Sequence, residues 1–233
     1  MMESPGSAVH VRDHRSVLAA AEKRLLVWIA GRLPGYVSSD QLTCLGLASL
    51  AAAGAAFASM RIAPAAAFGV VAALAGNWFG DSLDGTLARV RNQPRPRYGF
   101  YVDHVLDIGG TALLLGGMAC SGRMSPVVAL ATLGAYLMVS AESYLATHAL
   151  GVFRMSFLGF GPTELRMLVA AGALAAMPDP RVAMGPFGAP RLFDVGGVVA
   201  IAGLLGAFAF NVIRHTSLLY QAEPLPARAV RAA

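Results

Sequence analysis

Charged side chains are scarce in this sequence. Only 13% of its 233 residues are Asp, Glu, Lys or Arg, whereas 56% are hydrophobic and the mean hydropathy is +0.60. An ordinary soluble domain carries about 25% charged residues, so this composition excludes that class. It indicates a polytopic membrane protein, and the length suits one compact membrane domain covering residues 1–233.

Cysteine is almost absent. The two cysteines, Cys44 and Cys120, both lie in apolar runs. This pattern excludes a disulfide-rich scaffold and a cysteine metal site, so we expect both to be small core residues. No cleavable signal peptide is expected, because the first 30 residues carry several charges and no isolated apolar core.

The net charge of +5 comes without any cluster of basic and aromatic residues, so no nucleic-acid partner is expected. The basic residues fall between the apolar runs, where they set the orientation of a membrane protein. With six membrane helices, one side of the membrane keeps only Arg61, Arg123, Arg181 and Arg191. The other basic residues lie on the opposite side, which predicts that both termini are cytoplasmic.

Apolar runs between turn signals predict an all-α fold with six transmembrane helices and an amphipathic interfacial helix before them. The amphipathic helix is expected at 13–33, with Val17, Leu18, Leu25, Trp28 and Ile29 on one side. A helix packed on a neighbour is its alternative. The six-helix core is expected at 41–214, with helices at about 41–60, 65–90, 99–120, 126–148, 163–177 and 195–214. A cytoplasmic tail follows at 215–233.

Two pairs of aspartates stand between apolar segments. Asp81 and Asp84 are three residues apart, and Asp103 and Asp107 are four apart, so each pair shares a helix face. If the two helices face each other, the four carboxylates converge and cations must neutralise them. Oxygen ligands suit Mg²⁺, Mn²⁺ or Ca²⁺, which predicts a site for one or two divalent ions. Helix caps or solvated loops explain any single aspartate, but not four at this spacing.

Small and basic residues accompany the first pair. Gly85 and Ala88 lie four and seven residues after Asp81, so a bulky ligand has room on that helix face. Arg89 adds a forked cation that suits a phosphate. The stretch 81–107 reads D-x2-D-G-x2-A-R-x9-G-x3-D-x3-D. This pattern resembles the signature of the CDP-alcohol phosphotransferase (CDP-alcohol phosphatidyltransferase) family of integral membrane enzymes.

The resemblance implies transfer of a substituted phosphate group from a CDP-linked donor to an alcohol hydroxyl, with release of CMP, in phospholipid biosynthesis. It implies two divalent ions, Mg²⁺ or Mn²⁺, a membrane lipid as partner, and a homodimer. By this resemblance the metal ligands are Asp81, Asp84, Asp103 and Asp107. Asp107 is also the expected general base. The cytidine and phosphates are expected at Asp81, Asp84, Gly85, Ala88 and Arg89.

Two features bear on the donor and the acceptor. His104, directly after Asp103, and the GPTE segment at 161–164 resemble the branch in which CDP-choline or CDP-ethanolamine donates to diacylglycerol. The compact six-helix chain instead resembles the bacterial branch, in which CDP-diacylglycerol donates to a small polar alcohol, and we favour this branch. The possible acceptor-binding residues are His104, Arg154, Glu164 and Arg166. His104 is alternatively a helix-surface histidine, and Glu164 alternatively favours the positive end of its helix.

A membrane transporter is the distant alternative, because it too has room for six helices and acids within the membrane. The internal repeats and broken helices that many transporters contain are not visible here. Glu142 and His148 of the 126–148 helix are either functional groups within the membrane or residues at the wet end of the helix, and we favour the wet end for both. The expected location is the bacterial inner membrane, with the active site on the cytoplasmic side.

Overall fold

The computed structural model describes residues 19–151, 161–185, 188–223 and 225. Within these ranges the chain forms seven helices and no β-strand, which confirms the predicted all-α fold. The helices are α1 (Ala19–Ala30), α2 (Ser39–Ser59), α3 (Ala66–Val90), α4 (Pro96–Cys120), α5 (Pro126–Leu150), α6 (Pro162–Ala175) and α7 (Leu192–Ala222).

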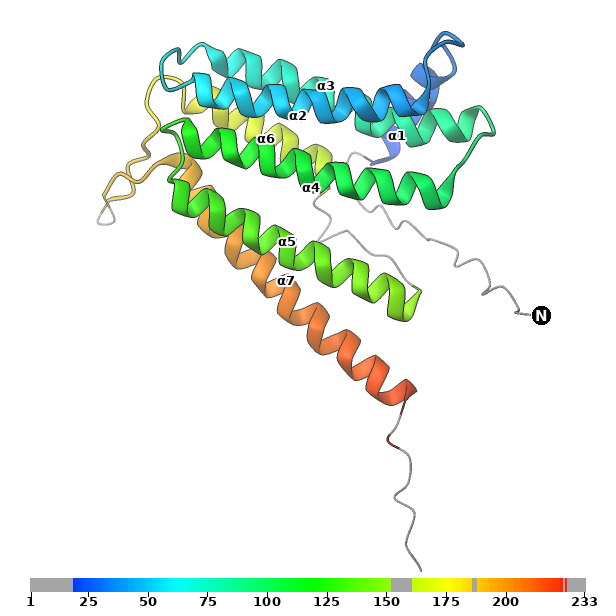
Figure 1. Cartoon of the computed structure of the whole chain (residues 1–233). Coiled ribbons are helices and arrows are strands. Elements are labelled where there is room, and N and C mark those ends of the chain that lie inside the picture. Colours follow the sequence, from blue (N-terminus) through cyan, green and yellow to red (C-terminus); the bar gives the residue numbers. More distant parts are fainter. Residues whose placement is uncertain (1–18, 152–160, 186–187, 224, 226–233) are drawn as a thin grey trace, which may run out of the picture.

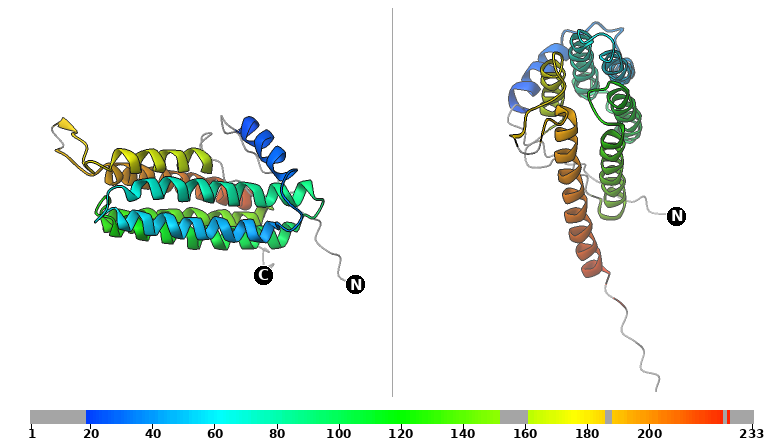
Figure 2. Two further views of the ribbon diagram at one scale, coloured as in Figure 1. Left: turned by 90° about the horizontal axis from the view of Figure 1, so that it is seen from above. Right: turned by 90° about the vertical axis from the view of Figure 1, so that its left-hand side faces the viewer.

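Helix α2 organises the bundle. It packs along α3 on one side and along α4 on the other. Helix α6 lies on α3, α1 contacts α3, and α7 pairs with α5, which in turn contacts α4 (Figure 1). Seen from above, α2, α3 and α4 run along one common direction (Figure 2), whereas α5 and α7 slant away from them in the view of Figure 1. The α3–α4 turn therefore lies at the same end of the bundle as the start of α2.

Local signals in the sequence explain where the helices begin. Ser38 caps α2: its Oγ accepts from the Gln41 backbone N–H at 3.2 Å, and the Gln41 side chain accepts from the Ser38 N–H at 2.8 Å. Prolines occupy the first turn of α4, α5 and α6, where no backbone N–H is needed. Gly151 ends α5 with a φ of 68°, in the left-handed region that glycine tolerates.

Glycines allow α2 to approach both of its neighbours closely. A Cβ atom added at Gly80 of α3 would lie 2.5 Å from the Leu42 carbonyl oxygen of α2. A Cβ added at Gly117 of α4 would lie 2.0 Å from the Gly54 carbonyl oxygen, also of α2. These contacts set the distance between the helices, because the backbone atoms cannot move aside as a flexible side chain can.

We expect Gly117→Ala to lower the free energy of unfolding by about 1–3 kcal/mol, because the new methyl group overlaps the α2 backbone. Gly203→Ala in α7 is the matched control, since a Cβ there meets no atom within 4 Å. It should be neutral or stabilise by about 0.5–1 kcal/mol. Thermal unfolding in detergent, followed by circular dichroism, would measure both. Equal melting temperatures for the two variants would contradict the packing account.

A buried arginine closes the opposite end of the bundle. Arg123 is 8% exposed, and it donates to the carbonyl oxygens of Ala176 at 2.6 Å and Met60 at 3.2 Å. These two residues cap the C-terminal ends of α6 and α2, where a cation is favourable. One of the four basic residues that we counted on that side is thus a buried helix cap.

Helix α1 packs on α3, as the alternative to a purely interfacial helix predicts. Leu26 and Ala30 are buried, and Leu26 belongs to the core cluster that also contains Leu83 and Leu87 of α3. Leu25 and Trp28, which we placed on the apolar side of an interfacial helix, are 46% and 55% exposed. The buried and the exposed apolar residues of α1 both recur at helical spacing. Packing on α3 covers the side that carries Leu26 and Ala30. Residues 13–18 of the expected helix lie outside the described residues.

Three helices, α2, α5 and α7, are long and apolar enough to cross a membrane. Six spans were predicted, but α3 and α4 carry the aspartates and α6 has only 14 residues. The last helix was expected to end near Arg214, yet α7 continues to Ala222. No glycine or proline interrupts 215–222, so the polar side chains alone do not end the helix.

Both cysteines were predicted to be small core residues, and this is wrong. Cys44 of α2 and Cys120 of α4 are free thiols on exposed positions. The core-facing positions beside them belong to other small residues, such as Gly46 and Gly117. An apolar neighbourhood in the sequence does not tell a core-facing from an outward-facing position on a membrane helix.

Candidate metal and nucleotide site

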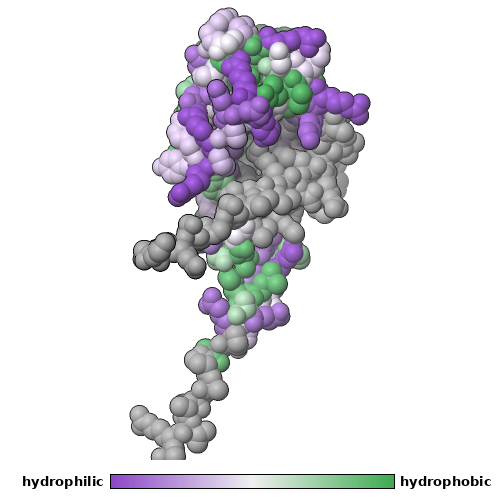
Figure 3. Space-filling model, turned by 90° about the vertical axis from the view of Figure 1, so that its right-hand side faces the viewer, coloured by the Kyte–Doolittle hydropathy of each residue, from purple (hydrophilic) through white to green (hydrophobic). Residues whose placement is uncertain are grey.

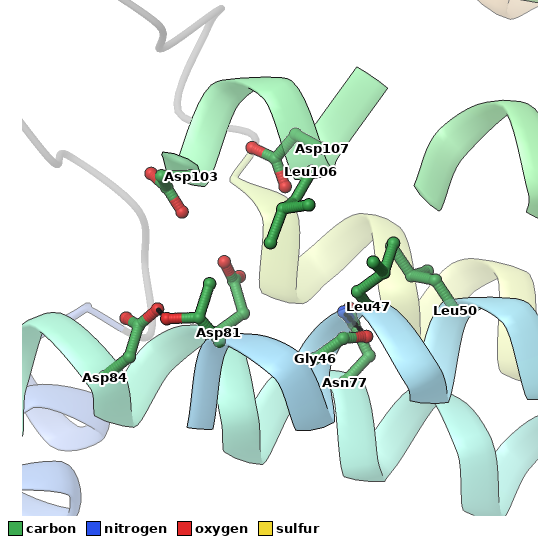
Figure 4. A pocket seen from close by; sticks show the side chains of 10 residues that line it. Gly46, Leu47, Leu50, Asn77, Asp81, Asp84, Asp103, Leu106 and Asp107 are labelled. Carbon is green, nitrogen blue, oxygen red and sulfur yellow. Dashed lines mark hydrogen bonds between the residues drawn. The ribbon is translucent and has the colours of Figure 1, made fainter. Parts of the chain in front are cut away.

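Carboxylates from α3 and α4 meet near the end of the bundle that carries the α3–α4 turn. Asp81, Asp103 and Asp107 each offer one oxygen atom, and the three atoms lie within 4.8 Å of one another (Figure 4). Three of the four aspartates therefore lie close together, as the spacing of the two pairs predicts. All three residues are partly buried, so a ligand can reach them from one side.

Helix α2 brings the two pairs together, since it packs against both α3 and α4. The carboxylates line a small cavity of about 270 Å³ of empty space, open solvent included. Its α2 wall consists of Thr43, Gly46, Leu47 and Leu50. The backbone of Gly46 lies close to α3, since a Cβ atom added at Gly80 would lie 2.6 Å from the Gly46 nitrogen. Helix α2, which contributes no aspartate to this cavity, thus sets their separation.

Asp84 lines the same cavity but has other partners. The Thr43 hydroxyl donates to its Oδ2 at 2.7 Å, and the Gly85 backbone N–H donates to its Oδ1 at 2.5 Å. Asp84 does not belong to the group of three converging oxygens. Thr43 was not identified from the sequence. Its position on α2, far along the chain from the aspartates, gave no signal.

Arg166 of α6 reaches the aspartate cluster. Its Nη2 forms an ion pair with Asp81 Oδ2, and its Nε donates to Asn77 Oδ1 at 2.7 Å. Asn77 also donates from Nδ2 to the Gly46 carbonyl oxygen at 3.0 Å. Asn77 is another site residue that sequence reasoning missed, although its place one helical turn before Asp81 was a usable signal.

The proposed nucleotide-binding residues lie further along α3. Arg89 is exposed, and its Nη2 donates to the Thr86 hydroxyl at 3.1 Å. Its Nη1 lies 3.4 Å from the place of a Cβ on Gly85, so the missing side chain of Gly85 leaves room beside the guanidinium. Ala88 lines a second, open cavity, together with Ser38 of the α1–α2 connection, Asp40 in the first turn of α2 and Arg95 of the α3–α4 turn.

The possible acceptor residues that the structure describes have different partners. His104 is buried rather than on the surface. Its Nδ1 lies 2.6 Å from the Phe100 carbonyl oxygen, and its ring packs between Phe100 and Tyr144. Glu164 accepts from the Gly161 N–H at 3.0 Å and so caps α6. A position at the positive end of the helix was the alternative to acceptor binding for this residue. Arg154 lies outside the described residues.

The two further titratable groups of α5 lie apart from this cluster. Glu142 is 9% exposed, and its Oε1 lies 2.6 Å from His215 Nδ1 of α7. The prediction of a wet position is therefore wrong for Glu142, since α7 covers this side of α5. His148 is exposed, as expected.

The donor set fits a hard divalent cation. Ligand oxygens bound at about 2.1 Å to one ion are at most about 4.2 Å apart, and those around Ca²⁺ about 5 Å. The three oxygens that lie within 4.8 Å of one another need little movement to share an ion of this kind. Carboxylates also provide the oxygen ligands that Mg²⁺ and Mn²⁺ prefer.

Comparisons with known proteins agree with this geometry. The family model described as CDP-alcohol phosphatidyltransferase matches residues 36–213. A search of curated proteins finds no match. A crystal structure of Mycobacterium tuberculosis phosphatidylinositol phosphate synthase (PgsA1) with CDP-DAG bound is similar, with a TM-score of 0.51 and 22% sequence identity, over 90% of this chain and 99% of that one. Because the family model covers well over half of the sequence, this protein belongs to the CDP-alcohol phosphatidyltransferase family and is a phosphotransferase enzyme.

Proposed function

We propose that the protein moves a phosphatidyl group from CDP-diacylglycerol to the hydroxyl of a small polar alcohol and releases CMP. The observation that carries the proposal is the meeting of Asp81, Asp103 and Asp107 in a chain of this family. The similar synthase structure has CDP-DAG bound, which supports the same donor here. Family membership also sets the transporter alternative aside.

The four aspartates are the proposed ligands of two divalent ions, Mg²⁺ or Mn²⁺. Asp81, Asp103 and Asp107 supply the converging oxygens, and Asp84 lines the same cavity. Bound ions of this kind clamp phosphate oxygens and neutralise the charge that develops on the leaving group.

Asp107 is the proposed general base. In the reaction the acceptor oxygen bonds to the phosphorus of the phosphatidyl group, the bond from that phosphorus to CMP breaks, and CMP leaves. The proton of the acceptor hydroxyl passes to the Asp107 carboxylate. A carboxylate can accept this proton when it lies within hydrogen-bond reach of the hydroxyl. Asp107 lines the cavity one helical turn after Asp103, so it faces the same space.

The nucleotide is proposed to lie on α3 beside Gly85, Ala88 and Arg89, with Asp81 and Asp84 at its phosphate end. The open cavity that Ala88 lines has about 900 Å³ of empty space, open solvent included, and Leu87 and Arg91 also line it. Arg89 is exposed on the same helix, where its guanidinium can pair with a phosphate.

Arg166 is the most favoured of the possible acceptor residues, because it pairs with Asp81 and its side chain is partly exposed, whereas His104, whose Nδ1 lies 3.9 Å from Asp103 Oδ2, is buried. His104 and Glu164 have packing and capping roles, which weakens the argument for the CDP-choline or CDP-ethanolamine branch. Arg154 stays a possible acceptor residue from the sequence alone.

The proposed setting is the bacterial inner membrane, with six spans, both termini and the site at the cytoplasmic face. Hydrophilic side chains gather at the end of the bundle that holds α1 and the α3–α4 turn (Figure 3). The exposed apolar residues of α1, Leu25, Val27 and Trp28, support an interfacial position for this helix.

A homodimer is also proposed. A Cβ atom added at Gly109 or Gly116 of α4, or at Gly134 of α5, would meet no atom within 4 Å. These small residues leave room for close approach by a second copy of the chain. Gly110 and Gly117, by contrast, are occupied by contacts with α2 of the same chain.

CMP release from purified protein in detergent with Mn²⁺ tests the donor. One reaction set would contain CDP-diacylglycerol with inositol phosphate, glycerol 3-phosphate, serine or inositol. The second set would contain diacylglycerol with CDP-choline or CDP-ethanolamine. We expect CMP from the first set alone, and CMP from the second set alone would overturn the proposed donor.

A further inference from the structure

Arg166 holds one side of the Asp81 carboxylate. It reaches from α6 to α3, with its side chain only 16% exposed, and pairs with Oδ2 of Asp81. Among the described residues, no group donates a hydrogen bond to Oδ1 of Asp81. The ion pair therefore fixes the direction of the carboxylate and leaves its second oxygen available to a metal ion.

Asn77 in turn holds Arg166. Its side chain lies in a buried position, with the residue 4% exposed, and it accepts from Arg166 Nε while it donates to the Gly46 carbonyl. Only one orientation of the amide satisfies both bonds, because its oxygen must face the guanidinium and its nitrogen the carbonyl. A continuous chain of hydrogen bonds thus runs from the α2 backbone through Asn77 and Arg166 to Asp81.

The start of α6 is anchored as well. The Thr163 hydroxyl donates to Glu22 Oε1 of α1 at 2.8 Å, and the Trp78 indole N–H of α3 donates to the same oxygen at 2.6 Å. Thr163 lies three residues before Arg166. Helix α6 is therefore tied to α3 close to the point from which Arg166 extends.

We infer that Arg166 and Asn77 are positioning residues that orient the Asp81 carboxylate for metal binding, with Asn77 acting through Arg166. The inference rests on the proposed function and adds these two residues to its metal site. Hydrogen-bond partners of a ligating carboxylate set its orientation, and their loss typically weakens metal binding by about 10- to 100-fold. This role does not exclude an acceptor contact, because Arg166 has further N–H groups.

Mn²⁺ binding to the full-length protein in detergent, without nucleotide, lipid or acceptor, tests the inference. Electron paramagnetic resonance would measure free Mn²⁺ during a titration. We expect about tenfold weaker binding for Arg166→Gln and for Asn77→Ala. We expect the double variant to bind no more weakly than Arg166→Gln, because the two residues act through one chain of bonds. A residue that only binds the acceptor would leave these values unchanged.

Arg166→Lys keeps the charge but cannot hold Asn77 and Asp81 with one planar group, so it should also bind Mn²⁺ more weakly. It serves as the second variant if Arg166→Gln does not fold. Arg61→Gln, at an exposed position outside the site, is the control and should bind like the wild type. Unchanged affinity in the Arg166 variants, or additive losses in the double variant, would overturn the positioning role. A wild type that binds no Mn²⁺ would instead contradict the proposed metal site.

Discussion

Asp107→Asn is expected to lower the rate of CMP release by about 100- to 10,000-fold, the contribution that a positioned general base typically makes. The amide cannot take up the proton that the acceptor hydroxyl loses when its oxygen bonds to phosphorus. The substitution also replaces a charged oxygen by a neutral one in the group of three carboxylates. We therefore expect weaker Mn²⁺ binding in the same variant. Initial rates of CMP release at saturating donor and acceptor would measure the effect.

Asp179→Asn is the matched control for this variant. Asp179 is an exposed aspartate outside the site, and it accepts from the Arg181 backbone N–H at 2.9 Å. The same chemical change there should leave CMP release unaffected. If Asp107→Asn released CMP at a rate close to that of the wild type, another group would have to accept the proton.

Removal of divalent metal is expected to reduce CMP release to background. Without metal, the carboxylates of Asp81, Asp103 and Asp107 stay in place, but nothing neutralises the charge on the leaving group or clamps the phosphates. The measurement is CMP release after dialysis against EDTA, followed by addition of Mg²⁺ or Mn²⁺. We expect either ion to restore activity.

Substitution of an aspartate in the cluster should change the Mn²⁺ dependence of activity, whereas substitution of an aspartate outside it should not. Asp103→Asn should need a higher Mn²⁺ concentration for half-maximal activity, because one of three converging oxygens loses its charge. Asp179→Asn is again the control, since Asp179 is an exposed aspartate outside both cavities. CMP release that continued at full rate in EDTA would contradict the metal role of all four aspartates.

The sequence by itself determined the helices and the family. Caps and breakers such as Ser38, Pro126 and Pro162 mark helix starts within a few residues of those observed. These signals act within one turn of the chain, so they can be recognised without tertiary structure. The spacing of the aspartates likewise determined that each pair shares a face, because the helix repeat is a local property.

The side of each helix that is buried was harder to predict. Cys44 on α2 and Cys120 on α4 lie in apolar runs, yet both are exposed. In a chain this apolar, hydrophobicity hardly distinguishes the core from the lipid-facing side. The contact surface is instead selected by close approach at glycines such as Gly54 and Gly80.

Only the tertiary structure decided which groups meet at the site. Asp81, Asp103 and Asp107 converge, whereas Thr43 and the Gly85 backbone engage Asp84. Arg166 reaches Asp81 across 85 positions of the chain, and Asn77 links both to α2. Helix periodicity specifies a face, but the partners of that face depend on how far each helix slides along its neighbour. In this protein, backbone contacts between α2, α3 and α4 set that register, and no local pattern records it.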